Sequence, residues 1–300
     1  MFFCVMTFKE ILDKYQYEKF LSKNLDMINS ENLQKRKAVL PVFIGVTRKG
    51  NVLKEDLTKM PHLLLTGRTG QGKSMFLHGL ISTLTQLKAP GELQFVLIDT
   101  KMIEFPNYQN IPLYLYSHKN IPKTVITDME DSCIVINALH EEMDQRYSLL
   151  NKAKCRSISD FNSKIDVKLP YIVLVIDELA DLIMVFEDGI ENPLFSLLTL
   201  GKAVGIHVVI ATARPCEPVL SGRILANLPT NIMFDTDNIN YVINGSDIEW
   251  DNLPNSPGEA LYISNGEHIL IRTPYIDEDE IKIAPELCAC PNIDIFSEEE

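Results

Sequence analysis

A glycine-rich stretch, GRTGQGKS, follows a short apolar segment of the chain. Its glycines, Gly67, Gly70 and Gly72, permit backbone conformations in which several amide N–H groups point at one anion. The pattern G-x-x-x-x-G-K-S is the spacing of a loop that binds nucleotide phosphates. A glycine turn that matches by chance is the alternative. The apolar strand pattern before the loop and the helical pattern after it favour phosphate binding.

Each part of this loop has an expected role. The helix that begins near Lys73 would direct the positive end of its dipole at the phosphates. We expect Lys73 to reach the β- and γ-phosphates and the Ser74 hydroxyl to bind Mg²⁺, so ATP and Mg²⁺ are the expected cofactors. The residues expected to bind the nucleotide are Gly67, Arg68, Thr69, Gly70, Gln71, Gly72, Lys73 and Ser74.

Two adjacent carboxylates, Asp177 and Glu178, end the apolar segment VLVIDE. Ligands of open α/β sheets bind outside the carboxyl ends of the strands. We expect Asp177 to hold Mg²⁺ through water and Glu178 to orient and deprotonate the attacking water. The alternative is that both residues only cap the next helix, because acidic residues favour helix N-termini. The glycine-rich loop makes the catalytic interpretation the stronger one.

Thr212 ends another apolar segment, HVVIAT. A polar residue at this place can sense the γ-phosphate, which would make Thr212 a catalytic residue. A threonine that forms only local hydrogen bonds at the strand end is an equally good interpretation.

Strand and helix patterns alternate along the chain, and they predict the elements that position these residues. Near-continuous apolar strands separated by helices indicate an α/β fold, with a mostly parallel central sheet and helices on both faces. Residues 264–267 (SNGE) signal a hairpin between two late strands, 259–263 and 268–272. The other main strands are expected at 62–66, 93–99, 171–177 and 206–212, and the helices at 74–86, 128–151 and 192–204.

Composition limits the classes of protein that fit. Apolar residues make up 46% of the chain and the net charge is −13, which argues against a general nucleic-acid coat. No apolar run approaches the roughly 18 residues of a membrane span. The six scattered cysteines suit reduced thiols and a cytoplasmic location, with membrane recruitment by a partner as an option.

The order of several segments resembles the motor domain of the FtsK/SpoIIIE DNA translocases. The resemblance extends from about residue 40 to about residue 283 and includes matches outside the phosphate motifs, such as KCRSISDFN and PGEALY. The segments that carry it are PHLLLTGRTGQGKS, VLIDTKMIEF, EEMDQRYSLL, LPYIVLVIDELADL and GIHVVIATARP.

This resemblance implies a RecA-like P-loop ATPase that hydrolyses ATP to move double-stranded DNA. It also implies a homo-oligomeric ring, usually a hexamer. Lys73, Ser74, Asp177 and Glu178 occupy the family's site positions. Asp99 begins the family's Asp-x-Lys pattern and is expected either to support the site or to bond a local turn.

Basic residues that could meet DNA phosphates gather after the long helical segment, at Lys152, Lys154 and Arg156. A solvated basic turn at a helix C-terminus is the alternative, because cations are favoured there.

Two positions depart from the family pattern. Ala213 stands where the family usually has glutamine, and Asn231 stands where it usually has an arginine that acts on a neighbour's nucleotide. Asparagine cannot stabilise developing phosphate charge as arginine does. Arg214 or Arg223 could substitute.

The expected organisation is an N-terminal helical segment (1–38), a motor domain (39–275) and an acidic tail (276–300), without a membrane-spanning segment or a winged-helix module. Two alternatives to DNA translocation stay open. One is an ATPase subunit of a conjugation or secretion machine, and the other is a nucleotide-binding subunit with little turnover.

Overall fold

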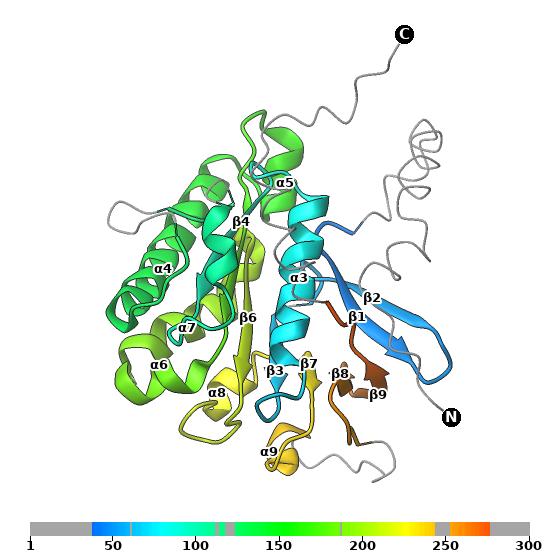
Figure 1. The fold of residues 1–300 in the computed structure, drawn as a ribbon. Helices are drawn as coiled ribbons and strands as arrows, with labels where there is room; N and C mark the ends of the chain where they lie inside the picture. Colours follow the sequence, from blue (N-terminus) through cyan, green and yellow to red (C-terminus); the bar gives the residue numbers. More distant parts are fainter. Residues whose placement is uncertain are drawn as a thin grey trace.

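The computed structural model describes residues 38–60, 62–111, 114–117, 124–186, 188–243 and 253–276. In this part of the chain a nine-stranded sheet carries helices on both faces (Figure 1). The expected N-terminal helical segment and acidic tail lie outside the described residues, apart from residues 38 and 276 themselves. None of the helices in the described ranges is both long and apolar enough to cross a bilayer.

The sheet has the strand order β2-β1-β9-β8-β7-β3-β6-β5-β4. Strands β7, β3, β6, β5 and β4 run parallel, whereas the pairs β2-β1, β1-β9, β9-β8 and β8-β7 are antiparallel. The strands are β1 (Pro41–Thr47), β2 (Val52–Asp56), β3 (Leu63–Thr66), β4 (Leu93–Ile98), β5 (Tyr171–Ile176), β6 (Ile206–Thr212), β7 (Asn231–Met233), β8 (Glu259–Ser264) and β9 (Glu267–Arg272).

The helices connect the parallel strands. The longest, α4, begins at Met129 because the Asp128 carboxylate caps it and accepts hydrogen bonds from two backbone N–H groups. The helices are α3 (Lys73–Leu87), α4 (Met129–Lys152), α5 (Ile158–Lys164), α6 (Leu179–Phe186), α7 (Asp188–Leu200), α8 (Gly222–Leu225) and α9 (Ile239–Ile243), with 3₁₀ turns η1 (Pro106–Asn110) and η2 (Gly201–Val204).

Both faces of the parallel strands are buried because successive side chains point to opposite faces. In β5, Ile172, Leu174 and Ile176 pack in the core beneath α4, α6 and α7. Val173 and Val175 pack in the second core, with the apolar side of α3. Figure 1 shows α4, α6 and α7 on one side of the sheet and α3 on the other. This two-sided burial explains why the strands read as continuous apolar runs.

The expected fold class is confirmed, and so is the late hairpin, which is β8 and β9. The sheet contains more antiparallel strands than the sequence indicated, because β1, β2 and the hairpin extend the parallel strands at one edge. The segment expected as one helix at 192–204 is divided. Helix α7 ends at Leu200, and the 3₁₀ turn that follows ends at Val204 and is capped by Gly205 with φ 79°.

A buried arginine, Arg146, joins α4 to the backbone just before β5 and β6. The Arg146 side chain is 2% exposed. Its guanidinium donates to the backbone carbonyls of Pro170 (2.8 Å) and Val204 (3.0 Å) and to the Glu142 carboxylate (2.7 Å). Pro170 precedes β5, and Val204 lies just before β6. Arg146 therefore fixes the helix against the starts of the strands that lead to Asp177 and Thr212.

We predict that Arg146→Met destabilises the protein by about 3–5 kcal/mol, because it leaves two carbonyls and one carboxylate without their donor. Urea unfolding followed by circular dichroism measures this change. Glu142→Gln keeps the carbonyl hydrogen bonds and should cost less than half as much. Equal losses in the two variants would show that the ion pair, and not the carbonyl bonds, provides the stability.

Candidate nucleotide-binding site

The glycine-rich loop connects β3 to α3 and packs closely against Phe234, which follows β7. A Cβ atom on Gly67 would lie 2.6 Å from Phe234 Cβ, and one on Gly72 would lie 2.9 Å from Phe234 Cε1. Both glycines also have positive φ, 148° and 123°. Side chains fit neither the space nor the backbone at these positions. The glycines therefore let the loop rest on the end of a neighbouring strand.

Backbone and side-chain bonds hold the loop in place. Gly258 N donates to Gln71 O (2.8 Å), and Arg68 N donates to Asp235 O (2.8 Å). The Arg68 guanidinium pairs with the carboxylates of Asp235 (3.0 Å) and Asp237. Arg68 was expected to bind the nucleotide, and the structure places its side chain on these two carboxylates.

Lys73, the first residue of α3, points its ammonium back into the loop. Nζ donates to Gly67 O (2.6 Å) and to Arg68 O (3.1 Å). Burial lowers the pKa of Lys73, and the charges of Glu178 and Asp177 oppose this shift. The loop and the acidic pair therefore lie close enough to interact electrostatically, as one site requires.

The register of three parallel strands aligns the other candidate residues. Thr66 pairs with Thr212 across β3 and β6, and Ile176 pairs with Ile210 across β5 and β6. The loop after β3, the acidic pair after β5 and Thr212 therefore emerge at one edge of the sheet. This is the carboxyl edge, where ligands of open α/β sheets bind.

Glu178 is held at both carboxylate oxygens. Thr212 Oγ1 donates to Oε1 (2.6 Å), and the backbone N–H of Ala213 donates to Oε2 (2.9 Å). The structure thus places the Thr212 hydroxyl on Glu178. Ala213 makes its contact with Glu178 through the backbone N–H, so this contact does not depend on the side chain at position 213.

Asp177 lies among other acidic groups. Burial, followed by the negative charges of Glu104, Asp99 and Glu178, raises the pKa of Asp177 to about 7. Asp99 is 1% exposed. Its Oδ2 accepts from two turn N–H groups, and its Oδ1 has no partner among the described residues. Crowded carboxylates of this kind suit a hard divalent cation.

A magnesium ion fits this donor set. Within the described ranges no three His, Cys, Asp or Glu side chains form a ready metal cage. Mg²⁺ does not need one, since it commonly binds one or two protein oxygens together with phosphates and water. Ser74 and Asp177 would serve as those protein groups.

The departures from the family pattern have structural consequences. Asn231 lies in β7 with 4% of its surface exposed, so its side chain is not offered to a neighbouring chain. Arg223 lies over the Phe195 ring at 4.1 Å and near Glu191 at 3.9 Å. Arg214 is exposed, and its guanidinium lies 3.7 Å from Met184 Sδ. Arg214 and Arg223 are therefore both exposed, whereas Asn231 is buried.

Several residues of the site were missed from the sequence alone. Phe234, Asp235 and Gly258 touch the loop from segments more than 150 residues away along the chain. The segment PGEALY, which contains Gly258, resembles the family, but its sequence predicts no contact with the loop. Asp99, in contrast, bonds a local turn, which was one of its two expected roles.

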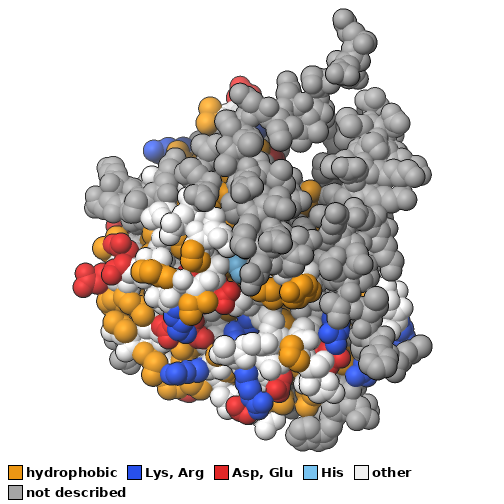
Figure 2. Space-filling model, in the orientation of Figure 1, with side chains coloured by type: hydrophobic (Ala, Val, Ile, Leu, Met, Phe, Trp, Pro, Cys, Tyr) orange, Lys and Arg blue, Asp and Glu red, His pale blue; other side chains and the backbone are white. Residues whose placement is uncertain are grey.

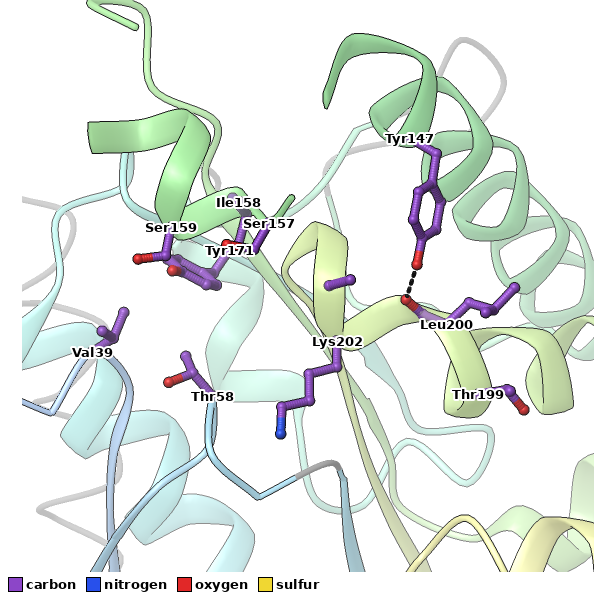
Figure 3. A pocket seen from close by; sticks show the side chains of 11 residues that line it. Val39, Thr58, Tyr147, Ser157, Ile158, Ser159, Tyr171, Thr199, Leu200 and Lys202 are labelled. Carbon is purple, nitrogen blue, oxygen red and sulfur yellow. Dashed lines mark hydrogen bonds between the residues drawn. The ribbon is translucent and has the colours of Figure 1, made fainter. Parts of the chain in front are cut away.

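The candidate DNA contacts lie near the opposite edge of the sheet. Lys152, Lys154 and Arg156 are all exposed, and they flank the C-terminal end of α4. Next to them an open pocket of about 480 Å³ is lined by residues 157–159 and by Tyr171, the first residue of β5 (Figure 3). Lys202 also lines this pocket, and its Nζ donates to Lys59 O (3.0 Å). These basic residues are therefore well separated from the nucleotide edge.

Comparisons of sequence relate the chain to DNA translocases. A model of the FtsK/SpoIIIE family matches residues 25–217. DNA translocase FtsK of Leptospira interrogans is 37% identical over 268 residues, and that of Haemophilus influenzae is 33% identical over 288 residues. These regions cover 84% and 85% of this chain. The chain spans 27% and 53% of the length of the two relatives.

Comparisons of structure agree. The pCW3 conjugation coupling protein TcpA, in its monomer form with ATPγS, has a TM-score of 0.72 and 25% identity, over 86% of this chain and 72% of that one. The cytoplasmic domain of the type VII secretion ATPase EccC from Thermomonospora curvata has a TM-score of 0.70 and 23% identity, over 85% and 32%. The fold is that of a P-loop ATPase, and the chain belongs to the FtsK/SpoIIIE family.

Proposed function

We propose that this chain binds ATP with Mg²⁺ and hydrolyses it to move double-stranded DNA, as a ring, in the form of a hexamer, in the cytoplasm. One observation carries the catalytic part. Glu178 is fixed at both oxygens by Thr212 and Ala213, at the same sheet edge as the Lys73 ammonium. The relatives that are named DNA translocases support DNA as the cargo.

In this proposal the loop residues 67–74 enclose the phosphates. Lys73 exchanges its bonds to the Gly67 and Arg68 carbonyls for phosphate oxygens. Mg²⁺, when bound, neutralises charge on the phosphates, and Ser74 and Asp177 hold it. Glu178 accepts the proton of the attacking water. Thr212 keeps the Glu178 carboxylate in orientation and links it to the strand next to the loop.

DNA contact is proposed for Lys152, Lys154 and Arg156. Over the described surface in Figure 2, basic and acidic side chains are interspersed. On the described part of this face the side chains form no extended basic surface, so we propose a local basic track instead. Such a track lies at the opposite end of the parallel strands from the nucleotide site. The same strands would therefore connect the site of hydrolysis to the site of DNA contact.

A second candidate is a motor of a conjugation or secretion machine. Two observations support it: the similarity to the coupling protein TcpA and the buried asparagine at position 231, which leaves catalysis dependent on other groups. DNA-independent hydrolysis together with retention of a protein cargo would favour it.

Substitutions at the two ends of the site should separate binding from hydrolysis. We expect Lys73→Ala to abolish nucleotide binding. We expect Glu178→Gln to bind within about threefold of the wild type and to hydrolyse about 100-fold more slowly or worse, because a general base contributes 10²–10⁴-fold. Fluorescent-nucleotide binding and phosphate release measure the two effects. Unchanged phosphate release from Glu178→Gln would remove Glu178 from the mechanism.

The Thr212 hydroxyl should affect turnover more than binding. We expect Thr212→Val, which keeps the shape but removes the donor to Glu178, to lower kcat about tenfold or more. KM should change little, and Thr212→Ser should restore most of the rate. An equal rise in KM with an unchanged kcat would instead assign Thr212 to nucleotide binding.

Duplex DNA should stimulate ATP hydrolysis, and binding should weaken steeply with salt. Replacing Lys152, Lys154 and Arg156 by alanine should reduce the slope of log K against log[salt] by about three, one for each lost phosphate contact. Lys49→Ala, in the turn between β1 and β2, is the matched control. Stimulation and salt slope that survive the triple substitution would place the DNA elsewhere on the chain.

A further inference from the structure

A third carboxylate, Glu104, lies beside the phosphate-loop helix α3. It belongs to the turn after β4, where Asp99 Oδ2 accepts hydrogen bonds from the backbone N–H groups of Glu104 (2.8 Å) and Phe105 (2.9 Å). Lys101 of the same turn pairs with Asp181 of α6 (3.0 Å). The turn is thus fixed at both ends, and with it the position of Glu104.

The Glu104 side chain faces α3. Its Oε2 lies 3.4 Å from Nε2 of His78, which is buried, and His78 Nδ1 lies 2.9 Å from the Tyr108 hydroxyl. Ser74 and His78 are four residues apart in one helix, so they lie one above the other on the same face. A carboxylate opposite this face can contact both side chains.

Charge supports this placement. Hydrogen bonds from His78 and, to a smaller extent, from Ser74 lower the pKa of Glu104, while burial opposes the shift. Both donors belong to α3, so these contacts place the Glu104 carboxylate on the helix face that carries Ser74 and His78.

The unpaired oxygen of Asp99 is a second, independent sign that this region is built for a cation. Asp99 Oδ1 is buried without a partner among the described residues, although an unsatisfied buried carboxylate oxygen is costly. Asp99 also holds the turn of Glu104 through its other oxygen, so the unpaired oxygen and the Glu104 carboxylate belong to one turn.

We propose that Glu104, held by His78 and Tyr108, is a further carboxylate of the divalent-cation site, which positions Ser74 and the water around the ion. This inference rests on the proposed nucleotide function and names one more residue of that site. His78 and Tyr108 are positioning residues, since they act through Glu104. A purely structural role, in which the Glu104–His78 pair only pins the turn to α3, would leave cation affinity unchanged.

The test measures cation dependence and nucleotide affinity separately, in the full chain. A fluorescent non-hydrolysable ATP analogue is titrated in EDTA, and MgCl₂ is then titrated at fixed analogue to find the Mg²⁺ concentration for half-maximal enhancement of binding. We expect Glu104→Gln to raise this concentration about tenfold, the lower end of the effect of groups that orient metal ligands. Affinity in EDTA should stay within about twofold of the wild type.

Three further variants sharpen the test. His78→Leu should raise the Mg²⁺ requirement in the same direction. His78→Gln, which can still donate to Glu104, should raise it less. Glu92→Gln, which removes an exposed carboxylate paired with Lys88 at the far end of α3, should behave as the wild type. If Glu104→Gln does not fold, as judged by its melting curve, His78→Leu and His78→Gln carry the comparison.

The outcomes are distinct. A wild type that binds no analogue with or without Mg²⁺ overturns the proposed function, and this inference with it. A wild type with Mg²⁺-dependent binding, and variants whose Mg²⁺ requirement stays within twofold of it, overturns this inference alone and assigns the Glu104–His78 pair to the fold.

Discussion

The alignment of three strand ends is the constraint on which the rest of the site depends. Thr66, Ile176 and Thr212 lie at one edge because β3, β6 and β5 pair in parallel and in register. A shift of one residue in either pairing would turn every side chain of a strand to the other face. It would also carry Glu178 away from Thr212. The two cores that bury β5 on both faces fix this register, and Arg146 anchors the other end of the same strands.

The arrangement of charged groups at that edge is a second constraint on the site. Lys73 lies against two backbone carbonyls of the loop and in the field of Glu178 and Asp177. Burial and the negative charges of Glu104, Asp99 and Glu178 nevertheless raise the pKa of Asp177 to about 7. A triphosphate alone would add negative charge beside these carboxylates. A divalent cation bound with it would offset that charge, and for that reason nucleotide and metal are best regarded as one ligand here.

Local patterns in the sequence were sufficient to predict the helices and strands and the motifs at their ends. The loop and the acidic pair each follow an apolar strand, and Thr212 ends one. The positions of these residues at strand ends were therefore enough to predict a shared edge. The packing of Gly67 and Gly72 on Phe234 could not be predicted in this way, because β7 contacts β3 through long-range pairing. The anchoring of Arg68 by Asp235 and Asp237, and of Glu104 by His78, depends likewise on tertiary contacts that no short spacing encodes.

The most direct test of the account is a crystal structure with Mg²⁺ and a non-hydrolysable ATP analogue. We predict that the triphosphate lies on the backbone amides of residues 67–74 and that Lys73 Nζ has left the Gly67 carbonyl for phosphate oxygens. We also predict that the ion lies between Ser74 and Asp177. Nucleotide bound at another place, or Lys73 still on its carbonyls beside an empty loop at saturating analogue, would contradict the account.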